Sequence, residues 1–449
     1  MGRLFGTDGA RGIANSELTC EMAMNIGRAA AFVLTRENVK HPKVLIGKDT
    51  RASSNMLEMA LAAGLCSVGA DVVLAGFIPT PAVAYLISDC GADAGVMISA
   101  SHNPCEYNGI KLFNNCGYKL PDAIEEEIES LVLDDMSSIK FPVGGDVGNV
   151  FIRHDYVDKY IDHVVNSTDV RLEGLKIALD CSNGSASYTA QRIFKALGAE
   201  LHIMHANPDG ENINANCGST HMNGLIDYVN AYGMDLGLAF DGDSDRCLAV
   251  DEKGNLIDGD RLIAIFAKSL KEQGKLKGNT AVVTVMTNIG FKQFAKENGI
   301  NVAETGVGDR YVLEEMLMGG YSLGGEQSGH IIFSELATTG DGILTALIVA
   351  ALVKKSGRAL SVLGGVMERY PQELININVT PDAKVRFYTD PNVTKVIKEA
   401  ELQLGDNGRI VVRASGTEPL IRVMVEGKNA EQIKRIADDS AKSIRKYLI

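Results

Sequence analysis

The chain has 449 residues, of which 45% are hydrophobic and 22% charged, a balance that excludes a disordered or fibrous protein. At roughly 150 residues per domain, this length predicts about three domains. The 44 basic and 57 acidic residues give a net charge of −13, which argues against nucleic acid or an anionic membrane as a partner. A small anionic substrate remains compatible with this charge, because local arginines can bind it.

The cysteines and the N-terminus bear on the location of the protein. The eight cysteines are scattered and never form a Cys-x-x-Cys pair, so we expect reduced thiols and neither a zinc knuckle nor a disulfide framework. Residues 1–8 lack an apolar signal-peptide run, and the longest apolar stretch, near residues 342–353, is too short to span a bilayer. We therefore expect a soluble, cytoplasmic protein.

A strand–helix–strand pattern occurs three times, in residues 43–74, 175–203 and 281–302. Each copy has a short apolar strand, a helix with apolar periodicity, a turn that contains glycine, and a second strand. This order predicts βαβ units with mostly parallel sheets. Ligands of such sheets gather beyond the carboxyl ends of the strands.

The C-terminal part follows a different pattern. Residues 373–379, 409–413 and 421–426 alternate polar and apolar side chains, which indicates half-exposed strands of a mainly antiparallel sheet flanked by helices. We therefore predict three related mixed α/β domains and a smaller C-terminal α+β domain. The predicted domains are residues 1–153, 154–254, 255–369 and 370–449.

Ser101 is a candidate nucleophile. It follows the predicted strand 95–98 within Ser101-His102-Asn103-Pro104, so it should lie on a loop at the end of a strand. A serine beside a histidine suggests nucleophilic catalysis, although serine and asparagine are also ordinary turn formers. Lys111 follows shortly afterwards and could return to the same site.

Asp241, Asp243 and Asp245 alternate on a short loop after the predicted strand 236–240. Their carboxylates converge on one point, which like charges tolerate around a cation, and oxygen-only ligands suit Mg²⁺ or Ca²⁺. An EF-hand is disfavoured because Arg246 stands where that loop requires glycine. A solvated turn is the simpler alternative.

Residues 324–330 form a glycine-rich loop with carboxylate, amide, hydroxyl and imidazole side chains. These donors and acceptors suit a ligand with many hydroxyl groups, such as a sugar, and the alternative is a plain turn. Residues 320–324 match the nucleophile elbow of hydrolases. That motif needs a following helix, however, and a glycine loop follows here.

Residues 413–419, together with Arg422, combine two arginines, two hydroxyls and a glycine. This composition predicts an anion cradle, because the guanidinium fork matches a phosphate group, although arginines on a surface strand are often only solvated. The sequence contains no Walker P-loop, no GxGxxG and no HExxH motif. Nucleotide hydrolysis, dinucleotide redox chemistry and zinc proteolysis therefore lose support.

These four motifs, in this order and one per predicted domain, resemble those of the α-D-phosphohexomutase superfamily. The resemblance covers nearly the whole chain and includes the opening Phe-Gly-Thr-Asp-Gly-Ala-Arg-Gly of residues 5–12. Gln327 within Gly-Glu-Gln-Ser-Gly-His, and the Arg-Ala-Ser-Gly-Thr-Glu-Pro loop, are most similar to the phosphoglucosamine mutases of this superfamily. Ser244 departs from the pattern, in which alanine or glycine is commoner. The resemblance implies four domains around a central cleft.

The resemblance also implies a role for each motif. Ser101 would carry a phosphoryl group, and Mg²⁺ would lie between that phosphoserine and Asp241, Asp243 and Asp245. The residues implied to line the reaction centre are Arg11, His102, Lys111, Arg246 and His330. The residues implied to bind substrate are Gly306 and Asp309 in a contact loop, Glu326 and Ser328 at the sugar, and Arg413, Ser415, Gly416, Thr417 and Arg422 at the non-reacting phosphate.

The reaction implied by the resemblance interconverts glucosamine 6-phosphate and glucosamine 1-phosphate through a 1,6-bisphosphate that turns round while bound, and supplies UDP-N-acetylglucosamine for the cell wall. Glucosamine or glucose 1,6-bisphosphate would be the activator, and a homodimer would form through residues 1–153. The general base is Lys111 or His330. The alternatives are a phosphomannomutase or phosphoglucomutase, a metal-dependent phosphatase, and a non-catalytic Ca²⁺-dependent sugar-binding module.

Overall fold

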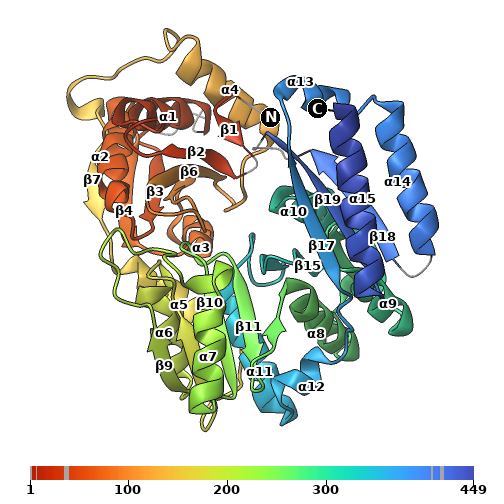
Figure 1. Cartoon of the computed structure of the whole chain (residues 1–449). Coiled ribbons are helices and arrows are strands. Elements are labelled where there is room, and N and C mark those ends of the chain that lie inside the picture. The colour runs from red at the N-terminus through yellow and green to blue at the C-terminus, as the bar shows by residue number, and fades with distance from the viewer. Residues whose placement is uncertain (1–2, 7, 35–39, 406–407, 415–418, 449) are drawn as a thin grey trace.

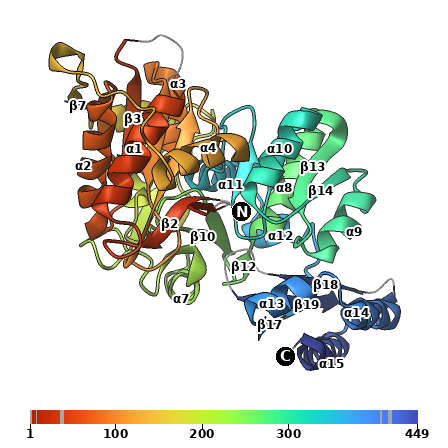
Figure 2. The ribbon, with the colours of Figure 1, turned by 90° about the horizontal axis from the view of Figure 1, so that it is seen from above.

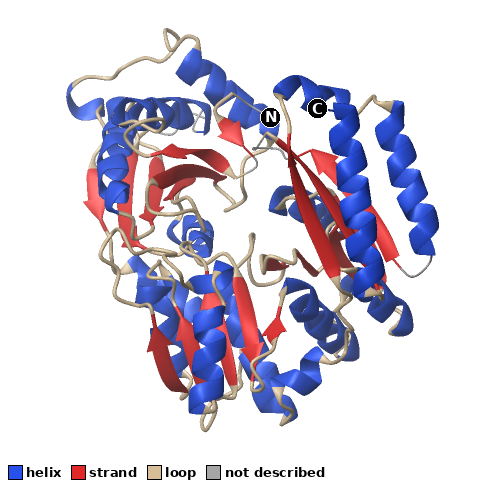
Figure 3. Cartoon of the chain, viewed as in Figure 1, coloured by secondary structure: helices blue, strands red, loops and turns tan. Residues whose placement is uncertain are grey.

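The computed structural model describes residues 3–6, 8–34, 40–405, 408–414 and 419–448. Four sheets follow one another along the chain, and helices cover them (Figures 1 and 3). Three mixed sheets precede a small antiparallel one. The predicted fold class, three mixed α/β units and a smaller C-terminal α+β unit, is confirmed.

The first sheet has seven strands in the order β1-β2-β6-β5-β3-β4-β7. Its strands are β1 (Phe5–Gly6), β2 (Gly9–Ile13), β3 (Lys43–Lys48), β4 (Asp71–Phe77), β5 (Ala94–Ile98), β6 (Tyr107–Asn114) and β7 (Val150–Ile152). Its helices are α1 (Cys20–Leu34), α2 (Ala52–Ser67), α3 (Thr80–Cys90) and α4 (Asp122–Leu133), with the short η1 (Gly144–Asp146). The central strands β3 and β5 pair in parallel and are buried along nearly their whole length, as expected for apolar strands covered on both faces.

The second sheet has the order β12-β11-β10-β8-β9. Its elements are α5 (Tyr156–Val165), β8 (Lys176–Asp180), α6 (Ala186–Ala196), β9 (Glu200–Met204), η2 (Gly218–Thr220), α7 (Asn223–Tyr232), β10 (Leu236–Phe240), β11 (Cys247–Asp251) and β12 (Leu256–Ile257). Strands β9, β8 and β10 are parallel, whereas β11 and β12 add antiparallel pairs. The loop between β10 and β11 is the one that carries the three aspartates.

The third sheet has the order β14-β13-β15-β16, with only its last pair antiparallel. Its elements are α8 (Gly259–Glu272), η3 (Lys277–Asn279), β13 (Thr280–Thr284), α9 (Ile289–Glu297), β14 (Asn301–Thr305), α10 (Asp309–Gly319), β15 (Leu323–Gly325), β16 (Ile331–Phe333), α11 (Gly342–Ser356) and α12 (Leu360–Gly364). The glycine-rich loop of residues 324–330 therefore spans the end of β15 and the turn before β16.

Helix α11 joins the second and third units. It contacts β10 and β11 of the second sheet and also α5 and α6 (Figure 1). Leu344 and Leu347 on this helix belong to one continuous core with Ile177 of β8 and Phe266 of α8. A helix that is apolar on nearly all sides must be buried, which explains why residues 342–353 form the longest apolar stretch of the sequence.

The C-terminal sheet has the order β17-β19-β18 and lies apart from the other three, as Figure 2 shows. Its elements are β17 (Gln372–Asn378), α13 (Pro381–Arg386), α14 (Pro391–Leu404), β18 (Gly408–Ala414), β19 (Leu420–Gly427) and α15 (Ala430–Leu448). Polar contacts connect it to the third unit. The buried Glu426 carboxylate accepts hydrogen bonds from Asn288 Nδ2 (3.1 Å) and from the backbone N–H of Ile289 (2.9 Å).

None of the helices in the described parts of the chain combines the length and the hydrophobicity that crossing a membrane requires.

Candidate active site

The candidate nucleophile and the aspartate loop meet although they are 140 residues apart in sequence. Ser101 follows β5, and Asp241 follows β10, so each stands beyond the carboxyl end of a central strand. Ser101 Oγ donates a hydrogen bond to Asp241 Oδ2 at 2.6 Å, and Ser101 is fully buried. Gly242 makes this approach possible, because a Cβ there would lie 2.6 Å from the Ser101 carbonyl oxygen.

The three aspartates form a compact group of buried carboxylates. One oxygen from each lies within 4.8 Å of the others, and all three residues are at most 2% exposed. Burial, together with the charges of Asp245 and Asp243, raises the pKa of Asp241 well above its usual value. Oδ1 of Asp243 and Oδ1 of Asp245 are buried without a hydrogen-bond partner among the described residues. Unpartnered anionic oxygens of this kind fit a hard divalent cation.

Ser244, the residue that departs from the superfamily pattern, lies between two of these aspartates. Its hydroxyl is 2.9 Å from the hydroxyl of Ser185, and its φ angle of 59° is in the left-handed region. The side chain therefore contacts α6's N-terminal turn and leaves the three carboxylates facing one another.

Lys111 on β6 provides the main positive charge in this group. Its Nζ lies 2.7 Å from Asp243, 3.1 Å from Asp8 and 3.5 Å from Asp245. Burial disfavours the charged ammonium group, but the three carboxylates outweigh this effect and raise the pKa of Lys111. Lys111 is therefore a fixed cation in this arrangement.

His330 reaches the same group from the glycine-rich loop. Its Nδ1 is 3.7 Å from Asp245 and its Nε2 is 3.7 Å from Asp309, while the backbone N–H of Gly340 donates to Nε2 at 3.0 Å. The Nε2 lone pair is thus engaged, and the ring proton is on Nδ1, toward Asp245. A backbone hydrogen bond also connects this loop to the strand that follows the aspartate loop, since Cys247 N–H donates to the Gly329 carbonyl at 3.1 Å.

His102 is held next to the nucleophile. Its Nδ1 lies 3.3 Å from Ser101 Oγ and accepts a hydrogen bond from Arg246 at 3.0 Å. Burial and the nearby positive charges of Arg246 and Arg11 lower the pKa of His102 to about 4. The imidazole beside Ser101 is therefore neutral near pH 7.

Three residues that the sequence motifs did not include hold the Ser101 loop in place. Arg51, completely buried, donates to the carbonyl oxygens of Ser101 (2.9 Å) and Asn103 (2.8 Å), and its Nε pairs with Asp49 at 2.8 Å. Asn214, from the second unit, donates to the same two carbonyls at 2.9 and 3.0 Å. The one available sequence signal was the charged Asp49-Thr50-Arg51 turn directly after a buried strand.

Two further residues are Asp8, which belongs to the opening motif of residues 5–12 but received no role there, and Lys119, which the motif analysis missed. Lys119 Nζ lies 2.5 Å from both Asp8 and Asp309, so it joins the first unit to the contact loop of the third. Asp8 also pairs with Arg11 and with Lys111. The resulting cluster has more carboxylates than cations, which leaves a negative excess for a divalent cation to balance. Its members are Arg11, Lys111, Lys119 and Arg246 against Asp8, Asp241, Asp243, Asp245, Asp309 and Glu326.

The residues predicted to bind substrate make fewer contacts with the aspartate loop than Lys111 and His330 do. Glu326 Oε1 accepts a hydrogen bond from the Gly308 backbone at 3.2 Å, and its carboxylate acts electrostatically on Arg246 and Arg413. Ser328 and Gly306 are exposed at the tips of their loops. Ser415, Gly416 and Thr417 lie outside the described residues.

Arg413 and Arg422 stand opposite each other on β18 and β19. Burial and the charge of Arg422 lower the pKa of Arg413, and Arg413 Nε is buried without a hydrogen-bond partner among the described residues. Two adjacent guanidinium groups repel each other, and an anion between them relieves that repulsion.

Four family models match successive parts of the chain. The models for phosphoglucomutase/phosphomannomutase alpha/beta/alpha domains I, II and III match residues 2–138, 155–254 and 258–370, and the model for the C-terminal domain matches residues 374–443. The chain belongs to the phosphoglucomutase/phosphomannomutase family. As a member of this phosphohexomutase family, it is an isomerase that transfers a phosphate group within its substrate.

Curated relatives of this phosphohexomutase match it over the full length. Proteins named phosphoglucosamine mutase from Clostridium novyi and Caldicellulosiruptor saccharolyticus are 54% and 53% identical to it, over 99% and 100% of both chains. Solved structures share the fold. A phosphoglucomutase/phosphomannomutase family protein from Burkholderia thailandensis is 24% identical, with a TM-score of 0.83 over 99% of this chain and 98% of that one. The N-acetylphosphoglucosamine mutase of Aspergillus fumigatus, solved with GlcNAc-6P and magnesium, is 17% identical, with a TM-score of 0.74 over 100% of this chain and 96% of that one.

The contacts of Arg51 predict that Arg51→Lys lowers turnover by about 10- to 100-fold, because a lysine keeps the charge but cannot bridge Asp49 and the loop carbonyls together. Steady-state rates and a thermal melt of the full-length protein measure this effect. Arg153→Lys, which changes an exposed arginine paired with Asp155, is the matched control and should leave turnover unchanged. Wild-type turnover in a folded Arg51→Lys protein would refute the positioning role of Arg51.

Proposed function

We propose that this phosphohexomutase interconverts glucosamine 6-phosphate and glucosamine 1-phosphate through a phosphoserine at Ser101. The observation that carries the proposal is the 2.6 Å contact between Ser101 Oγ and Asp241 inside the buried carboxylate group. The substrate assignment is supported by the full-length relatives named phosphoglucosamine mutase, at 53–54% identity. A phosphomannomutase or phosphoglucomutase is the second candidate, because the family models carry both of these activities in their names.

We assign Mg²⁺ to the site formed by Asp241, Asp243, Asp245 and the phosphoserine. A phosphoserine brings roughly −1.5 to −2 charges to a cluster that is already negative. When bound, the dication would offset this charge and stabilise the phosphoryl group in transit. Lys111, Arg246 and Arg11 supply the fixed positive charges around the same point.

In the first half of the proposed cycle, the P–O bond to Ser101 Oγ breaks and a P–O bond to the 1-hydroxyl of glucosamine 6-phosphate forms. The hydroxyl proton passes to His330, one of the two bases that the sequence left open, because Lys111 is held protonated by its three carboxylates and cannot accept it. The bisphosphate then turns round. The P–O bond to its 6-oxygen breaks as a P–O bond to Ser101 Oγ forms, and the proton returns from His330 to the 6-oxygen.

In this proposal, each substrate-binding loop contacts a different part of the substrate. Glu326 and Ser328 bind sugar hydroxyls, and the contact loop with Gly306 and Asp309 closes beside them. Arg413 and Arg422, with residues 415–417, hold the phosphate that is not reacting. The mutual repulsion of the two arginines supports an anion at this place. Each of the segments 1–153, 154–254, 255–369 and 370–449 thus contributes at least one loop.

We further propose a cytoplasmic enzyme that is activated by glucosamine or glucose 1,6-bisphosphate and forms a homodimer through residues 1–153. The eight free cysteines are consistent with a reducing compartment. Exposed apolar side chains on the first unit, among them Val150, Phe151 and Ile152 on the edge strand β7, support a protein contact there.

Ser101→Ala should abolish isomerisation, because no other described hydroxyl occupies its place against Asp241. Intact-protein mass spectrometry with peptide mapping should find phosphate on the peptide containing Ser101 in the wild type and none in the variant. Ser187→Ala, at a buried serine of α6, is the control and should retain both. Near-normal turnover of Ser101→Ala would disprove the phosphoserine cycle.

Removal of divalent cations should stop turnover, and Mg²⁺ should restore it, because the unpartnered oxygens of Asp243 and Asp245 then lack their counter-charge. Asp243→Asn should raise the Mg²⁺ concentration needed for half-maximal activity by at least about tenfold. Asp251→Asn, at the buried aspartate that ends β11 and accepts a hydrogen bond from the Asn255 backbone, serves as the control. Full activity in the presence of excess chelator would contradict a metal role.

Turnover of glucosamine, glucose and mannose phosphates, measured side by side, tests the substrate. We expect kcat/KM to be highest for glucosamine phosphate by at least about tenfold, the discrimination that one well-paired polar group provides. A higher value for mannose or glucose phosphate would favour the second candidate and leave the phosphoserine chemistry intact.

A further inference from the structure

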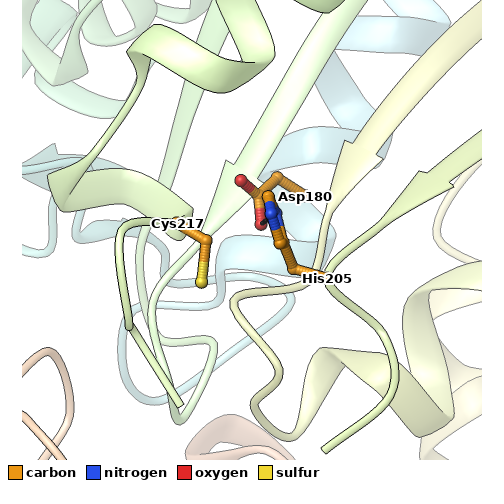
Figure 4. A group of neighbouring side chains, drawn as sticks. All are labelled: Asp180, His205 and Cys217. Carbon is orange, nitrogen blue, oxygen red and sulfur yellow. Dashed lines mark ion pairs between the residues drawn. The ribbon is translucent and has the colours of Figure 1, made fainter. Parts of the chain in front are cut away.

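A second group of potential metal ligands lies in the second unit, apart from the aspartate loop. Asp180 ends β8, His205 follows the end of β9, and Cys217 precedes η2. Their side chains gather at one place, as Figure 4 shows. One ligand atom from each lies within 4.8 Å of the other two, and both Asp180 and Cys217 are buried. The candidate active site uses none of these three residues.

The ligand atoms are oriented but incompletely paired. Asp180 Oδ1 and Oδ2 accept backbone N–H bonds from Ser182 and Gly218, each at 2.9 Å, which fix the carboxylate plane. His205 Nδ1 lies 3.1 Å from Asp180 Oδ1, and this contact raises the pKa of His205, although the buried Nδ1 atom has no well-directed hydrogen bond to a described residue. A carboxylate that is oriented by backbone N–H groups and stands beside an imidazole is typical of the surroundings of metal ligands in proteins.

The chemistry of the three donors differs from that of the aspartate loop. Oxygen-only ligands suit Mg²⁺, whereas a thiolate, an imidazole and a carboxylate together suit a borderline ion such as Zn²⁺. Burial and the neighbouring Asp180 raise the pKa of Cys217 to about 12, which favours the protonated thiol. A bound dication reverses this preference, because it stabilises the thiolate.

We propose that Asp180, His205 and Cys217 form a second metal site, which binds a divalent transition-metal ion of the Zn²⁺ class. On binding, the S–H bond of Cys217 breaks, its proton passes to solvent, and a sulfur–metal bond forms. The His205 side chain is about one-third exposed, so solvent reaches the site and water can complete the coordination. This proposal is independent of the proposed function, because it uses no residue of the mutase cycle.

A metal ion bound at this site would also help to hold the Ser101 loop in place. The segment between His205 and Cys217 carries Asn214, whose backbone N–H donates to the Ser182 carbonyl at 2.9 Å and whose side chain holds the Ser101 carbonyl. An ion that links both ends of this segment to Asp180 would fix the position of Asn214. We therefore expect the bound ion to raise the thermal unfolding temperature of the full chain.

Co²⁺ added to the full-length protein in excess Mg²⁺ provides the test, because Mg²⁺ fills the oxygen-only site and a thiolate–Co²⁺ bond has its own near-ultraviolet absorption. We expect one Co²⁺ per chain with this absorption, lost on addition of Zn²⁺, and proton release on binding. Cys217→Ser should remove the thiolate absorption. His205→Gln, a change at a side chain that is about one-third exposed, should weaken binding by about 10- to 100-fold.

Cys116→Ser, at an exposed cysteine away from the group, is the matched control and should bind Co²⁺ as the wild type does. If Cys217→Ser fails to fold, His205→Gln still decides the question. Absence of a thiolate–Co²⁺ band in the wild type, or a band that is unchanged in His205→Gln, would overturn the proposal.

Discussion

The candidate site depends on the ion pairs that the buried Lys111 ammonium group forms with Asp243 and Asp245. Lys111 comes from β6 of the first sheet, whereas Asp243 and Asp245, which it contacts, come from the loop after β10 of the second. A buried charge without a partner is very costly. Neither the lysine nor the aspartates could therefore be buried in charged form unless the two sheets dock in this way. The proposed reaction centre therefore coincides with the interface between the first two units.

The positive charge of Lys111 does not balance all the carboxylate charge at this interface. The pKa of Asp241 is raised, and Oδ1 of Asp243 and Oδ1 of Asp245 lack hydrogen-bond partners among the described residues. The protein therefore assembles more negative charge than its own cations balance. This excess could be balanced by a divalent cation, in agreement with the proposed metal site next to a serine held by Arg51 and Asn214.

The units are joined by two kinds of contact. An apolar core that includes α11 runs through the first three units, and separating it would expose a large hydrophobic surface to water. The C-terminal unit meets the third through polar contacts, in which Asn288 donates to Glu426 and Arg409 donates to the Thr287 carbonyl. Polar groups can exchange these partners for water, so the C-terminal unit is the one whose separation costs least. That property agrees with the proposal that Arg413 and Arg422 on this unit hold and release a substrate phosphate.

The amino-acid sequence determined those features that a short stretch of chain encodes. Periodic apolar residues defined the three α/β units and the antiparallel tail, and the alternation of Asp241, Asp243 and Asp245 defined a cation site, because all its ligands lie on one loop. Only the tertiary structure revealed the role of Arg51, which resembled part of a polar turn, and of Asn214 and Asp8. It alone also placed α11 between two units and brought Asp180, His205 and Cys217 together. The reason is physical: hydrophobic periodicity and ligand spacing act over a few residues. A contact between groups tens of residues apart, such as Arg51 and Ser101, or more than a hundred apart, such as Asn214 and Ser101, exists only once strands have paired and sheets have docked.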